Sequence, residues 1–234
     1  GLYVTGADGL GLLSVAAGGD VTLQGAQIRN AGANGLTQIA AAGNVTLSTL
    51  TESRSRDTTQ NANNYVRSSQ TTTPGTSVQG AGNVVVQAGH DVSLAAAQLG
   101  AGNALVVQAG HDLSSTAATD TATLDMQQKS GKHRLAASSS NDTVHGTVLQ
   151  AGGDIVLQDG NDLTLQAATV NSGTGGVAVS AGRDVALTTA EETHSWQRDE
   201  TKKKSGFLSS KTTTTHDAGT DTYALGTTLS GETV

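Results

Sequence analysis

Short apolar runs recur along this chain at nearly equal spacing. Residues 80–99 and 100–115 show the pattern twice: a Gly-Asn pair, a run of Val, Leu or Ala, a Gly-His-Asp triplet and a second apolar run. The triplet Gly89-His90-Asp91 recurs as Gly110-His111-Asp112, a step of 21 residues. Self-similarity at a fixed step of this size is typical of solenoids, in which each repeat forms one coil.

The apolar runs within one step predict strands. Val84-Val85-Val86 is β-branched throughout, and Val92-Ser93-Leu94 alternates apolar with polar side chains. Glycine adopts turn conformations at little cost, so the Gly-containing pairs between the runs predict corners. Two strands and a weaker third side form one triangular coil, and coils stack in parallel about 4.8 Å apart. The predicted fold is an all-β, right-handed parallel β-helix (solenoid), with Val85 in the core and Ser93 outside.

Three polar stretches interrupt the coils, at about 49–76, 116–146 and 188–227. Two of them contain matching turn signals, Ser130-Gly131 and Ser205-Gly206, each preceded by Lys. The flanking residues are rich in Thr and Ser, which favour strands and remain soluble. We therefore predict that the stretches are extruded β-hairpins. Disordered loops are the alternative that composition alone allows.

The polar stretches share one exit point in the coil. Each begins after an equivalent strand, since the glycines that precede those strands, Gly43, Gly110 and Gly182, lie 67 and 72 residues apart. All three hairpins are thus expected along one edge of the prism, with exits about 10–15 Å apart for two or three coils at 4.8 Å each. At that spacing they can reach one another, or fold back over a coil face as a second layer.

Composition suits a narrow prism of small side chains. Hydrophobic residues make up 35% of the 234 residues, aromatic residues only 2%, and there are 30 Gly and one Pro. The chain has no cysteine, which excludes disulfides and a Cys-based metal site. The net charge of −7 argues against a nucleic-acid partner. Because the first and last residues fall within the repeat pattern, residues 1–234 are expected to be a single β-helical segment of a longer array.

Acidic residues at the corners are the first candidates for chemistry. We expect five aspartates to occupy equivalent turns: Asp20, Asp91, Asp112, Asp154 and Asp184. Each is expected to cap its own turn through nearby backbone amides. A stacked Asp-His pair that holds a metal is the alternative. We expect no metal and no cofactor, so chelator treatment should leave the melting temperature unchanged.

A second corner carries the Gly-Asn pairs. Asn83 and Asn103 are expected to share a register and to form a stacked amide ladder. This role is structural and needs no ligand.

Many β-helices are polysaccharide lyases or hydrolases, so an enzyme is a competing hypothesis. Hydrolysis needs a convergent pair of carboxylates, and a lyase needs a base with charge neutralisation. The coil faces offer Ser, Thr, Gln and Ala, and a strand would point Glu191 and Glu192 to opposite faces. We therefore expect no catalytic residues.

Two kinds of motif carry a family resemblance. The corner sequences at 17–23, 42–47 and 181–187, of the form Ala-Gly-x-Asp-Val-x-Leu or close to it, resemble the haemagglutinin repeats of filamentous haemagglutinin-like exoproteins. The segment 202–215, Lys-Lys-Lys-Ser-Gly-Phe-Leu-Ser-Ser-Lys-Thr-Thr-Thr-Thr, is similar to a recurring extrusion in the second haemagglutinin-repeat region of contact-dependent growth inhibition effectors. The resemblance covers nearly the whole chain.

The resemblance implies a function and a location. It implies two-partner secretion through an outer-membrane transporter and display on the bacterial cell surface as part of a long fibre. It also implies a role in engaging the target outer membrane and in carrying a C-terminal toxin across. No toxin region is visible in this sequence. The alternative functions are an adhesin segment that binds glycans or receptors on host or neighbouring cells, and a polysaccharide-active β-helix enzyme.

The extrusions hold the expected contacts with a partner. Aromatic residues outside the core stack on sugars or enter a membrane interface, and lysines meet phosphate headgroups. The alternatives are aromatics that pack hairpin against coil and lysines that lie at a solvated hairpin tip. The candidate surface contacts are Tyr65, Trp196, Lys202, Lys203, Lys204, Phe207 and Tyr223. The expected partners are the transporter during secretion and the target-cell surface or outer membrane, with no nucleic acid and a monomeric fibre segment.

Overall fold

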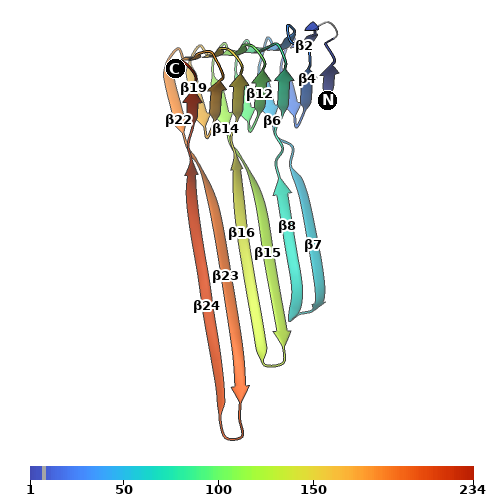
Figure 1. Ribbon diagram of the computed structural model, residues 1–234, viewed down its shortest axis with the longest axis vertical. Helices are drawn as coiled ribbons and strands as arrows, with labels where there is room; N and C mark the ends of the chain where they lie inside the picture. Colours follow the sequence, from blue (N-terminus) through green and yellow to red (C-terminus); the bar gives the residue numbers. More distant parts are fainter. Residues whose placement is uncertain (7–8) are drawn as a thin grey trace.

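The computed structural model describes residues 1–6 and 9–234. Three parallel sheets form the three sides of one stack of coils (Figure 1). Sheet A holds β1 (Leu2–Val4), β4 (Gln27–Asn30), β9 (Ser77–Gly80), β12 (Gln98–Ala101), β17 (Val148–Ala151), β20 (Thr169–Ser172) and β25 (Thr228–Ser230). Sheet B holds β2 (Leu12–Ala17), β5 (Leu36–Ala41), β10 (Asn83–Ala88), β13 (Leu105–Ala109), β18 (Ile155–Gln158) and β21 (Val177–Ser180). Sheet C holds β3 (Val21–Gln24), β6 (Val45–Ser48), β11 (Val92–Ala95), β14 (Leu113–Thr116), β19 (Asp162–Gln166) and β22 (Asp184–Thr188). The predicted parallel β-helix is confirmed.

Each coil contributes one strand to sheets B, C and A in turn. Alternate side chains point into the prism, where stacked aliphatic residues form one continuous core. The largest fully buried side chains are Ile28, Ile39, Leu47, Leu94, Leu99, Leu105, Leu113, Leu149, Ile155, Leu157, Leu163 and Leu165. Across residues 1–6 and 9–234, no helix has the length and apolarity needed to cross a bilayer.

The side-chain alternation along strand β10 differs from the one that the sequence predicts. Val84 and Val86 are fully buried, whereas Val85 is half-exposed and faces outward. Ser93 also faces outward, as predicted, between buried Val92 and Leu94. A run of three valines has no alternation of its own, so its register depends on the corners and on neighbouring coils.

The Gly-Asn corner also differs from the prediction. Strand register aligns Val84 with Leu105, a step of 21, so Asn83 lies beside Ala104 and not beside Asn103. The Asn83 side-chain oxygen accepts the Ala104 N–H at 3.1 Å, and Asn103 donates to the Ala33 carbonyl at 3.1 Å. The expected amide ladder is therefore absent from this corner.

Asp154 lies at a different corner from the other four aspartates. It precedes β18 of sheet B, whereas the others precede strands of sheet C. Its carboxylate accepts the N–H of Gly176 at 2.9 Å. The short Ala-Gly-Gly-Asp sequence thus serves two corners, and sequence alone does not tell them apart.

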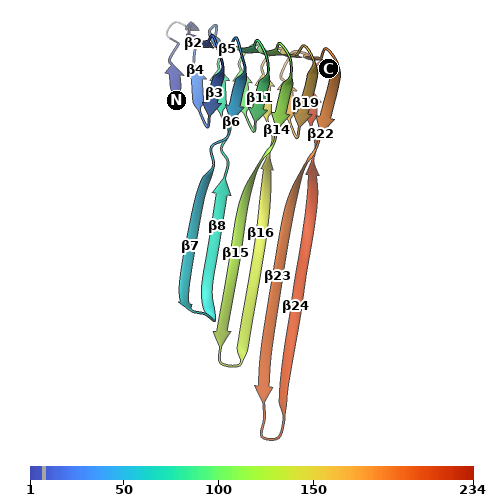
Figure 2. The same ribbon diagram turned by 180° about the vertical axis from the view of Figure 1, so that it is seen from behind.

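The polar stretches form a fourth, antiparallel sheet. It consists of β7 (Glu52–Asn61), β8 (Asn64–Thr72), β15 (Ala118–Ser130), β16 (His133–His145), β23 (Ala190–Ser205) and β24 (Ser210–Leu225). The predicted hairpins are confirmed, and all three leave the corner between sheets C and A, at every second coil. They pair edge to edge and extend away from the coils as one flat sheet, here called the hairpin blade (Figures 1 and 2). The alternative expectation, that the hairpins fold back over a coil face as a second layer, is therefore wrong.

Coils without a hairpin close this corner with two residues. The first of these is Gly25, Ala96 or Ala167, and each has a positive φ of 44° to 53°. The coils with a hairpin re-enter through a Gly-Thr pair instead, at 75–76, 146–147 and 226–227. The Thr hydroxyls lie against backbone carbonyls of neighbouring strands, and so join each hairpin to the stack.

Candidate functional site

The hairpin blade is the largest feature that projects from the coil stack. Its hairpins lengthen along the chain, with strands of 10 and 9, then 13 and 13, then 16 and 16 residues. Hydroxyl contacts join neighbouring hairpins, such as Ser69 to Thr123 at 2.7 Å. Pairing between β16 and β23 ends at His133 and Lys202, so the third hairpin continues beyond the second as a two-stranded ribbon (Figure 1).

The loop at 206–209, here called the tip loop, ends that ribbon. The N–H of Gly206 donates to the Ser209 carbonyl at 2.7 Å and closes the turn. Phe207 is 100% exposed and Leu208 is 92% exposed. Burial normally hides such large apolar side chains, and adjacent fully exposed ones point to a contact surface.

Basic residues flank the tip loop on both strands. Lys204 pairs in register with Lys211, and Lys203 precedes them. None of these three lysines takes part in the ion pairs found among the described residues. The tip therefore combines an exposed apolar pair with uncompensated positive charge.

Strand register divides the blade into two faces of different character. One face carries the apolar side chains Val66, Leu124, Met126, Leu135, Trp196 and Tyr223. The opposite face is mostly Ser and Thr and includes Tyr65, which Arg67 covers at 4.5 Å from the ring centre. The face with Trp196 thus carries more of the large apolar side chains.

Trp196 lies on β23, the second strand from the edge of the blade. It sits directly opposite Gly219, and a methyl group at Gly219 would lie 2.8 Å from the indole nitrogen. Gly219 therefore makes room for the ring, as glycines do beside cross-strand aromatics. The indole is 47% exposed and borders a shallow groove of about 670 Å³ that Leu124 and Ser139 also line.

Histidines on the blade pair with carboxylates. Among the described residues the pairs are His133 with Glu200 (2.7 Å), His145 with Asp120 (3.0 Å), His194 with Glu192 (2.8 Å) and His216 with Asp199 (2.6 Å). Hydrogen bonds favour the ionised carboxylate, so each of these four acids has a lowered pKa. For Asp120 the bonds from Thr73 outweigh the opposing desolvation, and for Glu192 the bond from the Val144 N–H contributes most. The largest contributions come from His216 for Asp199 and from Lys202 for Glu200.

Glu200 shows the largest of these shifts. Lys202, at 2.9 Å, and His133 lower the pKa of the Glu200 carboxyl to about 2. Because His133 belongs to β16 and Glu200 to β23, this pair fastens the third hairpin to the second. Lys202 therefore takes part in the contact between the second and third hairpins. Lys203 forms none of the ion pairs found among the described residues.

The seven predicted contact residues all lie on the blade but do not form one site. Trp196, Tyr223, Lys202 and Lys204 share a face, with Tyr223 near the base against His194. Tyr65 and Lys203 point to the opposite face, and Phe207 is in the tip loop. Tyr65 contacts Arg67 and Asp125, and Tyr223 contacts His194, so these aromatic side chains pack against other blade residues.

Sequence reasoning missed some residues of the blade. Leu208 follows Phe207 directly, and the adjacency of two large apolar residues in a polar stretch was the available signal. Three of the histidine–carboxylate pairs join residues 17 to 67 positions apart, so no local pattern reveals them. Glu192 and His194 are two residues apart, so a strand places them on the same face.

A second group of functional side chains runs along the corner between sheets B and C. Its members share one register and are here called the corner ladder: Asp20, Asn44, Asp91, Asp112, Asp162 and Asp184. From Asp20 to Asp112, each side-chain oxygen accepts the N–H of the next member, at 2.7 to 3.2 Å. The predicted capping is therefore partly wrong, because the amide belongs to the next coil and not to the same turn.

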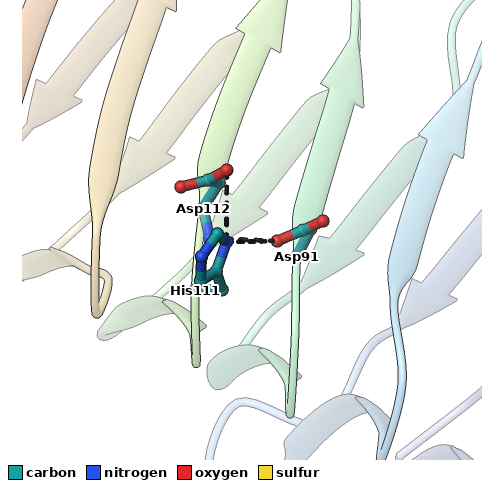
Figure 3. A group of neighbouring side chains, drawn as sticks. All are labelled: Asp91, His111 and Asp112. Carbon is teal, nitrogen blue, oxygen red and sulfur yellow. Dashed lines mark hydrogen bonds and ion pairs between the residues drawn. The ribbon is translucent and has the colours of Figure 1, made fainter.

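His111 lies between two members of the corner ladder. Its Nδ1 is 3.3 Å from Asp91 Oδ1 and 3.2 Å from Asp112 Oδ2 (Figure 3). Among residues 1–6 and 9–234, these three side chains are the group of His and acidic residues whose ligand atoms converge within 4.8 Å. The Asp112 pKa is lowered, chiefly by the hydrogen bond from Asn161, so this carboxylate stays ionised.

Comparisons with known proteins agree with this architecture. Residues 58–132 match the family model described as "Hemagglutinin repeat". The deoxyribonuclease CdiA of Dickeya dadantii is 37% identical over 228 residues, which is 96% of this chain and 6% of that protein. The 16S rRNA endonuclease CdiA of Enterobacter cloacae is 42% identical over 89 residues, covering 38% of this chain and 3% of its own length. The tRNA nuclease CdiA of Escherichia coli is 49% identical over 61 residues, or 26% and 2%. No solved structure matches the chain.

These matches concern a small part of each relative. The chain spans 6% or less of the curated relatives it matches, and the nuclease names describe those whole proteins. The family match covers the first hairpin's tip and return strand, two coils and all of β15, so coil and extrusion belong to one repeat. Together the family match and the relatives support a CdiA-like hemagglutinin-repeat region.

Proposed function

We propose that this chain is a non-catalytic segment of a secreted bacterial surface fibre, and that its hairpin blade engages the outer membrane of a target cell to aid toxin delivery. The observation that carries the proposal is the tip loop, with Phe207 and Leu208 fully exposed between lysines at the far end of the longest hairpin. Export through an outer-membrane transporter belongs to the same proposal, which the CdiA relatives support.

The tip has the chemistry of a membrane-surface contact. Burying a Phe or Leu side chain contributes about 1.5–3 kcal/mol each. A lysine near an anionic surface contributes about 1 kcal/mol, and three of them flank the loop. The sum is about 6–9 kcal/mol before the cost of immobilising the fibre, which suits reversible attachment.

Blade geometry presents the tip first. The third hairpin extends beyond the other two, so a flat surface that approaches the blade end meets the tip loop before the shorter tips (Figure 2). The apolar pair thus lies where contact with a membrane begins.

The test is a double substitution in the tip loop, Phe207→Ser with Leu208→Ser. Binding of the chain to vesicles that contain lipopolysaccharide should weaken about tenfold or more, since two apolar side chains no longer enter the surface. The matched control replaces Lys129 and Lys132 with Ser at the shorter second tip, and it should change binding much less. Equal binding by the tip-loop variant and the unmodified chain would refute the proposal.

An adhesin is the second candidate, and Trp196 favours it. An exposed indole beside a shallow groove that Ser139 and Thr220 also line is a surface on which a sugar ring can stack. Under this function Trp196→Ala abolishes attachment to glycan-coated surfaces, while the tip-loop variant keeps it. The opposite ranking of the two variants supports the membrane contact.

A further inference from the structure

We propose that Asp91, His111 and Asp112 bind one divalent transition-metal ion at the corner between sheets B and C. This inference departs from the expectation drawn from the sequence, in which the aspartates only cap turns. It concerns the coil stack, so it is independent of the function proposed for the blade.

The distances fit a metal ion. Ligands about 2.0–2.1 Å from a tetrahedral Zn²⁺ lie about 3.3 Å from one another. His111 Nδ1 lies 3.3 Å from Asp91 Oδ1 and 3.2 Å from Asp112 Oδ2. The three side chains are half-buried to exposed, which leaves the remaining coordination positions to water.

Neighbouring rungs hold the two carboxylates in place. Asp112 Oδ1 accepts hydrogen bonds from the Asn161 side chain at 2.7 Å and from the Asp162 N–H at 3.2 Å, so its Oδ2 is left facing the imidazole. Asp91 Oδ1 accepts the Asp112 N–H at 3.1 Å. Outer partners of this kind orient metal ligands and strengthen binding.

The side chain of Arg183 occupies the equivalent place two coils further on. The Arg183 guanidinium bonds Asp162 and lies 3.4 Å from Asp184 Oδ2, so it fills the gap between two successive acidic rungs. The gap between Asp91 and Asp112 has the same pair of carboxylates, but a histidine stands in the position of the arginine. A metal ion held by that histidine supplies the positive charge that Arg183 carries itself.

One imidazole with two carboxylates suits Zn²⁺, Co²⁺, Mn²⁺ or Ni²⁺. His90 lacks such a site, because its register places it between Asp91 and the neutral Asn44.

The experiment titrates the whole 234-residue chain, without an affinity tag, with Zn²⁺ by calorimetry and with Co²⁺ by visible absorption. We expect saturable binding of one ion and a rise in the melting temperature, since binding to the native state stabilises it. Binding should weaken as the pH falls, because protons compete for the ligands.

Two matched variants locate the site. His111→Asn should weaken binding by about tenfold or more, as loss of a ligand does at least what loss of an outer partner does. The fold tolerates Asn there, since Asn161 occupies the same position one coil later. His90→Asn removes a neighbouring histidine and should leave the affinity unchanged. No saturable binding, or equal loss in the two variants, would overturn the proposal.

Discussion

Asp159 occupies a position that belongs to a small apolar residue. It ends the sheet B run in its coil, where the equivalent residues of the other coils are Ala17, Ala41, Ala88, Ala109 and Ala181. Its side chain is buried without a hydrogen-bond partner, and desolvation raises its pKa even though the amides of Asn161 and Gly182 oppose this. A carboxylate in place of alanine therefore weakens this coil.

We expect Asp159→Ala to stabilise the protein. Removing an unsatisfied buried group should increase the free energy of unfolding by about 1–3 kcal/mol. Since the folded pKa is raised above the unfolded one, the charged form opposes folding, and the gain should be larger at pH 8 than at pH 4. Urea unfolding at the two pH values measures this. Asp154→Ala, which removes a carboxylate that does accept an N–H, should destabilise instead.

Val84 and Val85 test the register of the coil strands. Val84 is fully buried and Val85 points outward, so Val84→Asp should cost about 3–5 kcal/mol as an unpaired buried charge. Val85→Asp should cost under about 1 kcal/mol, as surface changes usually do. Thermal unfolding of both variants gives the comparison, and equal losses would show that the strand faces are assigned wrongly.

At the scale of elements, each hairpin depends on its re-entry into the coil. Thr76 is fully buried, and its hydroxyl lies 2.9 Å from the Leu23 carbonyl and 3.0 Å from the Ser48 carbonyl. The hydroxyl also accepts the Ala26 N–H at 3.3 Å. One side chain thus joins the re-entering strand to the coil before it and to the exit of its own hairpin.

Replacing that hydroxyl with a methyl group should be costly. Thr76→Val keeps the shape but leaves buried backbone groups unpaired, so the free energy of unfolding should fall by about 1–3 kcal/mol. Thr46→Val, on the outward face of β6, is the control and should be close to neutral. Chemical denaturation monitored by circular dichroism distinguishes the two, and similar stability of both variants would contradict the role of the hydroxyl.

The junction between the second and third hairpins should be sensitive to acid. The pKa of Glu200 is lowered to about 2 by Lys202 and His133, from an ordinary value of 4.5. Its stabilising contribution is therefore complete above about pH 4.5 and is lost as the pH falls towards 2. Fluorescence of Trp196, the one tryptophan in the chain, should report loosening of the blade over that range.

A charge-neutral variant provides the comparison for the acid titration. Glu200→Gln removes the titrating group, so its blade should be less stable at pH 7 but should change less between pH 4.5 and 2. Parallel acid curves for the two proteins would contradict this role of Glu200.

At the scale of the molecule, the sequence predicts what repeats and misses what pairs at long range. The coil step and the shared exit follow from local turns and apolar runs, because every coil buries the same core. The pairing of hairpins into one blade does not, since strands rich in Thr and Ser have weakly specified register. For the same reason Tyr65 and Trp196 were grouped as contacts although they lie on opposite faces. The tip loop was predictable, because Phe207 stands out in a polar stretch.

The coils should fold without the third hairpin. Coils that lack a hairpin close the same corner with two residues, as Ala167-Ala168 does between β19 and β20. Replacing residues 189–227 with Ala-Ala should therefore preserve sheets A, B and C, because strand register aligns Thr188 with Gln166 and Thr228 with Thr169. The melting temperature of the coils should change little, while binding to vesicles that contain lipopolysaccharide should be lost with the tip loop. The control replaces residues 49–76 with Ala-Ala, which removes the first hairpin from the opposite edge of the blade and leaves the tip loop in place. Binding retained without the third hairpin, or lost equally without the first, would assign the contact to another part of the molecule.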